Sequence, residues 1–235
     1  MFAAIFNGGI IIAGALIGCF AGKHIPKRIT ESLHKALALC VGVIGIMGAV
    51  TTSDIIHAMI CLIIGTIIGE LMHIERGIDR LGNRLRERFD RHSDRENNLF
   101  AEGFLSASLL FCVGSMAILG SFDAGIRHDY STIMAKSLID GVTAVGLAAT
   151  LGMGVTFSGV MVLVYQGLLT ILAGFLSRYM DMIVITEMKA VGGILLMGMS
   201  LNMLFPKQHI RLGNMIPAIF FPIVYFPVIR MIGLS

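Results

Sequence analysis

Apolar residues occur in long runs along most of the chain, and polar residues gather in the short stretches between them. A transmembrane helix needs about 20 consecutive, mostly apolar residues. Runs of this kind predict eight spans, at residues 2–22, 36–52, 55–72, 99–121, 132–151, 153–177, 184–204 and 212–232. The fifth and seventh are the weakest because they contain charged residues, so a count of seven spans, or a re-entrant segment, stays open.

The composition agrees with a membrane location. Hydrophobic residues make up 56% of the 235 residues and charged residues only 14%, whereas roughly a quarter of the residues in soluble domains are charged. Eight spans would use about 160 residues, which leaves no room for a separate extramembrane domain. We therefore predict an all-α fold, a polytopic transmembrane helix bundle of seven or eight spans, with residues 1–235 forming a single integral membrane domain.

One long polar segment, residues 73–98, interrupts the apolar runs. Its apolar residues recur every three or four positions with arginines on the other flank, which predicts a cytoplasmic amphipathic helix that extends the third span. This helix is expected to lie on anionic lipid, to pack against a partner subunit, or to be a solvated connector. Acidic residues balance its arginines, so no nucleic-acid partner is expected.

The distribution of basic residues favours one orientation. If the N-terminus is outside, the inner loops carry 13 of the 18 Lys and Arg residues and the outer side carries five. The positive-inside rule thus predicts that both termini are outside. No basic segment precedes the first apolar run, so a cleaved signal peptide is not expected. The four cysteines lie in apolar runs, which predicts neither disulfides nor a metal site.

Two segments of the chain resemble each other. Residues 41–48, VGVIGIMG, match residues 191–198, VGGILLMG, at five positions, and both copies follow an Ile-Thr-Glu triplet. Residues 111–120 share part of the pattern. In the predicted topology the first two copies run in opposite directions, which indicates an internal inverted repeat of the kind that builds secondary transporters. Chance matches in a chain with 28 glycines are the alternative.

Glycine spacing predicts how the helices pack. Gly14, Gly18 and Gly22 lie four residues apart on one face of the first span, and such faces let helix backbones approach closely in lipid. The last span contains three prolines, each of which removes a backbone donor and predicts a kink.

Ionisable residues inside a span cost about 2.5–3.5 kcal/mol at the helix centre, so those present indicate function or a paired partner. Asp140 lies in the fifth span, and Lys136 one turn earlier is expected to face it. Glu187 opens the seventh span. We expect Asp140 and Glu187 to be cation or proton sites that also involve Lys136. Polar residues expected to line the path are Asn7, Ser158, Gln166 and Asn202.

Structural explanations exist for the same residues. Glu187 is as readily explained as an interface residue that reaches water, and Lys136 with Asp140 as a purely structural buried ion pair. Signals of catalysis are weak. A lone Glu-x-x-His, Glu70 to His73, lacks the second copy that a metal site needs, and the chain has no phosphate-cradling loop. Neither an enzyme nor a cofactor is expected.

Several segments resemble those of one family. They are Asn7-Gly8, Gly114–Ser121 (GSMAILGS), Lys136–Gly141 (KSLIDG), Gly152–Ser158 (GMGVTFS), Gln166-Gly167 and Gly213–Pro217 (GNMIP). They look like the bacterial integral membrane family called domain of unknown function 554. The resemblance covers nearly the whole chain and implies a polytopic inner-membrane protein with seven or eight helices. It also implies recurring polar positions at Lys136, Asp140, Ser158, Gln166, Glu187, Asn202 and Asn214, which adds Asn214 to the candidate site residues.

Two functional hypotheses follow. The first is a small transporter or ion-conducting protein of the bacterial cytoplasmic membrane that binds an inorganic cation, a proton or a small solute. A chain this small encloses little space, so a homo-oligomer is expected. The second is a non-transporting membrane scaffold or sensor that recruits a partner through the helix predicted at residues 73–98.

Overall fold

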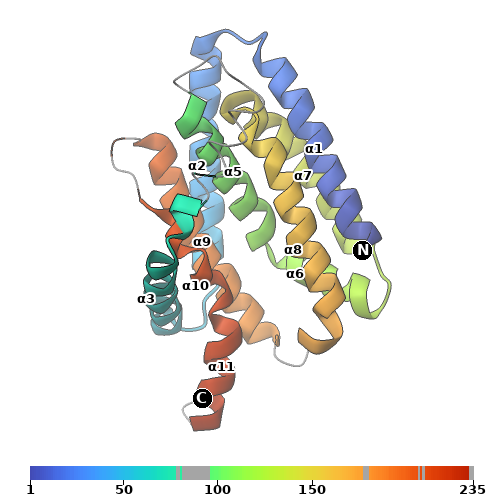
Figure 1. Ribbon diagram of the computed structural model, residues 1–235, viewed down its shortest axis with the longest axis vertical. Coiled ribbons are helices and arrows are strands. Elements are labelled where there is room, and N and C mark those ends of the chain that lie inside the picture. The colour runs from blue at the N-terminus through green and yellow to red at the C-terminus, as the bar shows by residue number, and fades with distance from the viewer. Residues whose placement is uncertain (78–79, 81–95, 177–179, 206, 208–209, 233–235) are drawn as a thin grey trace.

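Helices make up most of the chain that the structure describes (Figure 1). This computed structural model describes residues 1–77, 80, 96–176, 180–205, 207 and 210–232. The elements are α1 (Phe2–Gly22), α2 (Lys27–Ala49), α3 (Ile55–Met72), α5 (Glu96–Val113), α6 (Ser115–Ile126), α7 (Ser131–Leu151), α8 (Gly154–Leu176), α9 (Met182–Leu204), η1 (Leu212–Met215), α10 (Pro217–Phe220) and α11 (Pro222–Ile232). No strand occurs among these residues, which confirms the predicted all-α class.

Six helices, α1, α2, α3, α7, α8 and α9, are each long and apolar enough to cross a membrane. Two further pairs of segments reach the length and hydropathy of a membrane span only when each pair is taken together. Both pairs are bent: α5 with α6 by 59°, and η1–α10 with α11 by 40°. The described residues therefore contain six candidate spans, or eight if each bent pair counts as one. This confirms a polytopic helix bundle.

Individual spans differ from their predicted bounds. The second begins at Lys27, directly after Pro26, rather than at residue 36. The fourth is divided where Gly114 adopts an extended conformation (φ −63°, ψ 139°) between α5 and α6. The eighth is divided before α11, where Pro222 has no amide proton to continue the helical ladder. The two spans that contain charges, by contrast, are the continuous helices α7 and α9.

The amphipathic helix predicted over residues 73–98 does not extend α3 directly. α3 ends at Met72, and His73 caps it in the left-handed conformation (φ 52°), which a continuing α-helix cannot contain. Residues 78–79 and 81–95, which include most of the arginines of this segment, lie outside the described residues.

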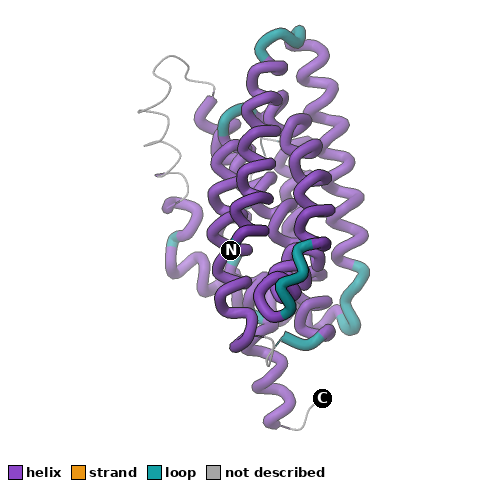
Figure 2. Tube along the Cα trace, turned by 90° about the vertical axis from the view of Figure 1, so that its right-hand side faces the viewer, coloured by secondary structure: helices purple, strands orange, loops and turns teal. Residues whose placement is uncertain are grey.

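Close contacts between helices give their relative directions. Gly14, Gly18 and Gly22 of α1 meet α7 at residues 141, 145 and 149, so α1 and α7 run parallel. Gly8 meets Gly159 of α8, whereas Met1 meets α8 further along at residue 167, so α1 and α8 run antiparallel. Figure 1 labels these three helices next to one another, and Figure 2 shows the long helices of the bundle side by side.

We name the two ends of the molecule. The turn end holds residues 23–26, which connect α1 to α2. The N-terminal end is the opposite end, where α1 begins. The start of α9 lies at the N-terminal end, because Glu187 contacts Thr52 and Ser53 between α2 and α3. Arg230 near the end of α11 pairs with Asp181 just before α9. The first helix thus begins, and the last described helix ends, at the same end of the molecule (Figure 1).

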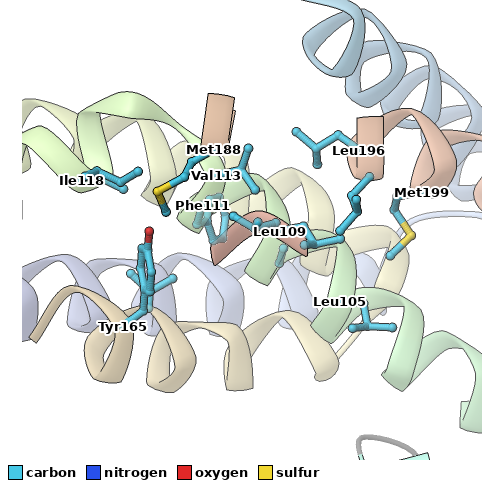
Figure 3. Packing of buried hydrophobic residues seen from close by; sticks show 14 of the residues in the cluster. Leu105, Leu109, Phe111, Val113, Ile118, Tyr165, Met188, Leu196 and Met199 are labelled. Carbon is cyan, nitrogen blue, oxygen red and sulfur yellow. The ribbon is translucent and has the colours of Figure 1, made fainter. Parts of the chain in front are cut away.

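Buried apolar side chains of α5, α6, α8 and α9 form the central part of the core, and Figure 3 shows them interleaved. The labelled members are Leu105, Leu109, Phe111, Val113, Ile118, Tyr165, Met188, Leu196 and Met199. α9 is the most enclosed of the six continuous spans, whereas α2 and α3 leave most of their apolar surface exposed.

The two copies of the predicted repeat lie on α2 and α9, which pack against each other in opposite directions. Gly45 and Gly48 of α2 meet Gly193 of α9, and Ser200 of α9 donates a hydrogen bond to the carbonyl oxygen of Ala38. The repeat pairs Gly193 with Val43, however, and Val43 is 56% exposed. The copies therefore have the expected opposite directions, but they use different faces and form no symmetric interface.

Candidate functional site

Four polar side chains from three helices meet inside the bundle. Asn7 of α1, Lys136 and Asp140 of α7, and Gln166 of α8 are all buried. The amide Nδ2 of Asn7 donates hydrogen bonds to Oδ2 of Asp140 over 3.1 Å and to Oε1 of Gln166 over 3.0 Å. The ammonium group of Lys136 forms an ion pair with the same oxygen of Asp140. We call these four residues the polar cluster.

Glycines bring the three helices close enough for these contacts. A Cβ atom on Gly14 of α1 would lie 2.4 Å from the carbonyl oxygen of Gly141 in α7. A Cβ atom on Gly8 of α1 would lie 2.8 Å from the carbonyl oxygen of Gly159 in α8. Gly8 and Gly141 are direct chain neighbours of cluster residues, so the polar cluster depends on backbone approaches that larger residues would prevent.

The polar cluster holds one positive and one negative charge away from water. Burying an ion pair costs several kcal/mol per ion, and mutual attraction offsets this only when further hydrogen bonds are present. Oδ2 of Asp140 accepts from both Lys136 and Asn7, whereas Oδ1 accepts no hydrogen bond from the described residues. The ammonium of Lys136 also lies 5.8 Å from the centre of the Phe111 ring, within cation–π range.

Two amide atoms of the polar cluster are buried without a partner among the described residues. They are Oδ1 of Asn7, an acceptor, and Nε2 of Gln166, a donor. Leaving a buried polar atom without a hydrogen bond costs about 1–3 kcal/mol. Native proteins generally satisfy such atoms with protein groups, water or a ligand. These two atoms therefore leave one acceptor and one donor of the cluster open to a further hydrogen-bonding group.

The polar cluster borders the break between α5 and α6. Phe111, whose ring faces Lys136, lies in the last turn of α5, and α6 begins after Gly114 without a side-chain cap. Transporters commonly build their sites from such discontinuous helices. The sequence analysis missed both Phe111 and the break, although a Gly-Ser pair such as Gly114-Ser115 is a recognised position for a kink.

Glu187 lies apart from the polar cluster, at the N-terminal end, and is fully buried. Its Oε2 accepts a hydrogen bond from Oγ1 of Thr52 over 2.7 Å. Its Oε1 accepts from the backbone amide and the hydroxyl of Ser53, each over 2.8 Å. Glu187 thus ties the turn between α2 and α3 to α9. The sequence analysis missed Thr52 and Ser53, although the polar run TTSD between two apolar runs indicates a turn.

The hydroxyl of Thr52 lies between two acceptors. Its Oγ1 is 2.7 Å from Oε2 of Glu187 and 2.9 Å from the carbonyl oxygen of Asp54. A hydroxyl group donates only one proton. The carbonyl oxygen of Asp54 also accepts from the backbone amide of His57 over 3.1 Å, so both acceptors have a donor when Thr52 donates to Glu187.

The other three candidate residues lie outside the polar cluster and bond to the backbone. The hydroxyl of Ser158 donates to a carbonyl oxygen three residues earlier in α8. The amide of Asn202 bonds both the N–H and the carbonyl group of Ile210, each over 2.8 Å, and so closes the loop after α9. Oδ1 of Asn214 accepts from the backbone amide of Glu75 over 2.8 Å. The structure therefore brings together four of the eight candidates.

Two further ionisable residues meet at the turn end. Nε2 of His34 in α2 lies 3.5 Å from Oε1 of Glu102 in α5, and also 3.3 Å from the carbonyl oxygen of Met203. Both side chains are about one-fifth exposed, so this pair reaches water.

Asp181 begins α9 at the N-terminal end. Its Oδ1 accepts from the backbone amide of Val184 over 3.0 Å, and its Oδ2 lies 2.5 Å from the guanidinium of Arg230. Partial burial acts to raise the pKa of Asp181, but these hydrogen bonds outweigh it and hold the pKa below its ordinary value of 3.8. The ion pair connects α11 to the start of α9.

Among the described side chains, no group of three or more His, Cys, Asp or Glu residues is placed to hold a metal ion. All four cysteines are free thiols.

Comparisons with known proteins identify relatives over the full length of the chain. The family described as "Protein of unknown function (DUF554)" matches residues 2–227. The "Uncharacterized membrane protein YdfK" of Bacillus subtilis (strain 168) is 31% identical over 239 residues, which cover 100% of this chain and 99% of the relative. The "Uncharacterized protein YqgA" of Escherichia coli (strain K12) is 26% identical over 215 residues, 91% of each chain. No solved structure matches the chain.

Proposed function

The chain belongs to the DUF554 family, and from that premise we propose that it is a small secondary transporter or ion channel of the bacterial cytoplasmic membrane. In this proposal Asp140 is the coupling site for an inorganic cation or a proton, and Lys136, Asn7 and Gln166 hold it. Glu187, at the N-terminal end, is a second candidate for binding the same ion.

The polar cluster is the observation that carries this proposal. A charged residue within a membrane span is costly and generally faces a pathway or pairs with another charge. Asp140 is paired with Lys136, but the cluster also holds amide atoms of Asn7 and Gln166 that have no partner among the described residues. A purely structural ion pair gives no reason for leaving these atoms unsatisfied, whereas a binding site does.

The proposed mechanism uses the charge of Asp140. Binding of a cation or proton neutralises the carboxylate, which weakens its attraction for Lys136 and changes the cost of burying the pair. A ligand that binds two helix arrangements unequally shifts the population between them. The bent pair of α5 and α6, which borders the cluster, is the element best placed to respond.

Orientation in the membrane follows from the basic residues. Among the described residues, Lys23 and Arg211 of the predicted inner loops lie at the turn end, where Arg211 comes within 4.0 Å of Glu70. We therefore place the turn end in the cytoplasm and the N-terminus outside. In this proposal several copies of the chain assemble, because α2 and α3 leave apolar faces open to lipid or to another copy.

Ion flux into proteoliposomes tests the proposal. Wild-type protein is compared with Asp140→Asn under imposed sodium, potassium and proton gradients. Asp140→Asn alone leaves the ammonium of Lys136 without its counter-ion, so the double variant Lys136→Met/Asp140→Asn serves as the matched control for folding. We expect flux in the wild type, and its loss in both variants even where the double variant assembles normally.

Two results would contradict this function. Wild-type flux retained by the well-assembled double variant would make the ion pair purely structural. A wild type that moves no ion under any gradient would favour the scaffold or sensor hypothesis, whose segment, residues 73–98, lies largely outside the described residues. Reversing several arginines between Arg84 and Arg95 and testing for lost partner binding would then be decisive.

A further inference from the structure

The free atoms around Asp140 suit a proton better than a metal ion. Its Oδ2 already faces two N–H donors, on Lys136 and Asn7, and the unpartnered atom of Gln166 is a third N–H group. Sodium and potassium ions require several oxygen atoms that replace their hydration shell. Within the polar cluster only Oδ1 of Asp140 and Oδ1 of Asn7 are oxygens without a donor, and N–H groups of the other residues would repel a metal ion placed between them.

The side chains of Asn7 and Gln166 make only one of the two hydrogen bonds that a pair of facing amide groups can form. One hydrogen bond joins Nδ2 of Asn7 to Oε1 of Gln166, and what remains is one acceptor on Asn7 and one donor on Gln166. A water molecule complements both, because it donates to an acceptor and accepts from a donor at the same time. Buried waters typically bridge such otherwise unsatisfied polar groups.

Few titratable groups surround Asp140. Lys136 comes from its own helix, and Cys112 of α5 is the other titratable side chain that interacts with it electrostatically. α1 and α8 contribute only the neutral amides of Asn7 and Gln166. These amides do not titrate, so a proton that arrives at Asp140 from their side must come through water.

We propose that the ion bound at Asp140 is a proton, and that it reaches Oδ1 through a water molecule held between Asn7 and Gln166. This inference rests on the proposed function and names its coupling ion. In the transfer step the water molecule gives one proton to Oδ1 of Asp140, which becomes a neutral carboxyl group, and takes one proton from bulk water. No other bond changes.

The ammonium of Lys136 keeps its charge during this step and loses its counter-ion. The ring of Phe111, whose centre lies 5.8 Å from Nζ, can stabilise the ammonium by a cation–π interaction. Phe111 lies in the last turn of α5. When Asp140 is protonated, Lys136 is attracted less to Asp140 in its own helix and, in relative terms, more to Phe111 beside the bend between α5 and α6. Protonation is in this way coupled to the one broken helix beside the site.

Proteoliposomes with a trapped pH-sensitive dye test this inference. Wild type is given a pH gradient in the absence of sodium and potassium, and then sodium or potassium gradients without a pH gradient. The variant Gln166→Met keeps the length of the side chain and removes the donor for water. Its matched control is Thr150→Val, which removes a buried hydroxyl of α7 that bonds only to a carbonyl oxygen of its own helix.

We expect the wild type to move protons without sodium or potassium, and Gln166→Met to lower that rate by roughly tenfold or more, while Thr150→Val keeps it. Asn7→Leu removes the other side of the water site and should give the same loss if Gln166→Met fails to assemble.

Sodium or potassium flux without proton movement would overturn this inference and leave the proposed function standing. Equal proton rates in Gln166→Met and Thr150→Val would overturn the water relay. Absence of all flux in the wild type would remove the proposed function itself.

Discussion

Gly18 of α1 lies so close to Val145 of α7 that a Cβ atom on residue 18 would be 2.3 Å from the carbonyl oxygen of Val145. Gly18→Ala must therefore push the two helices apart. We expect it to lower the free energy of unfolding by about 1–3 kcal/mol, the usual cost of overpacking. Thermal or denaturant unfolding in detergent measures the change.

Gly9 provides the matched control for this prediction, because it lies in the same helix and a Cβ atom there meets nothing within 4 Å. Gly9→Ala should leave the free energy of unfolding unchanged or raise it by up to about 1 kcal/mol, since alanine favours helix more than glycine does. Equal destabilisation by the two substitutions would show that α1 and α7 do not pack as described.

Lys136 and Asp140 should show strong coupling in a double-mutant cycle. Lys136→Met or Asp140→Asn alone leaves one buried charge without its partner, and each should lower the free energy of unfolding by about 3–5 kcal/mol. The double variant should recover most of this loss because it buries no charge. Unfolding in bicelles measures all four proteins. If the two single effects simply add, the ion pair is absent from the folded protein in the membrane.

The positions of the spans could be predicted from hydropathy, but their continuity could not. Hydropathy counts apolar residues and does not register the direction of the chain. The break at Gly114 therefore went unnoticed within an apolar run, whereas the kink that the prolines predicted in the last span is present as the bend before Pro222. Conversely, Asp140 and Glu187 made their spans look weak. Both carboxylates are bonded inside the bundle, so α7 and α9 are continuous.

The site was predictable to the extent that it depends on spacing within one helix. Lys136 and Asp140 are four residues apart, so their pairing follows from helix geometry. The contacts of Asn7 with Gln166 depend on how α1 and α8 pack, which the sequence does not specify. An asparagine that bonds to the backbone, as Asn202 does, has the same sequence appearance as one that lines a site.

Glu187 should tolerate replacement by glutamine better than replacement by leucine. In Glu187→Gln the amide oxygen accepts from Ser53 and the amide nitrogen donates to Thr52, whose hydroxyl then donates to the carbonyl oxygen of Asp54. Every polar atom of the turn keeps a partner, so the free energy of unfolding should change by less than about 1 kcal/mol.

Glu187→Leu instead removes the acceptor for both Thr52 and Ser53 and should cost about 1–3 kcal/mol or more. Hydrogen exchange of the amide of Ser53, which donates directly to Glu187, reports the same loss locally. If Glu187→Gln loosens the turn as much as Glu187→Leu does, the turn requires two acceptor oxygens at residue 187.

The contact between Asp181 and Arg230 should make the start of α9 sensitive to acid. The pKa of Asp181 is lower in the folded protein than its ordinary value of 3.8, so its stabilising contribution is complete above about pH 4 and is lost as the pH falls through the folded value. Both side chains are more than two-fifths exposed, which limits the ion pair to about 1 kcal/mol or less.

Hydrogen exchange at pH 3 should therefore be faster, relative to the intrinsic rate, at the amide of Val184 and in the last turn of α11. In Asp181→Asn the protection of these amides should be equally low at pH 7 and pH 3, because the group that titrates is gone. Protection in wild type that does not change across this range would mean that the ion pair is absent in solution.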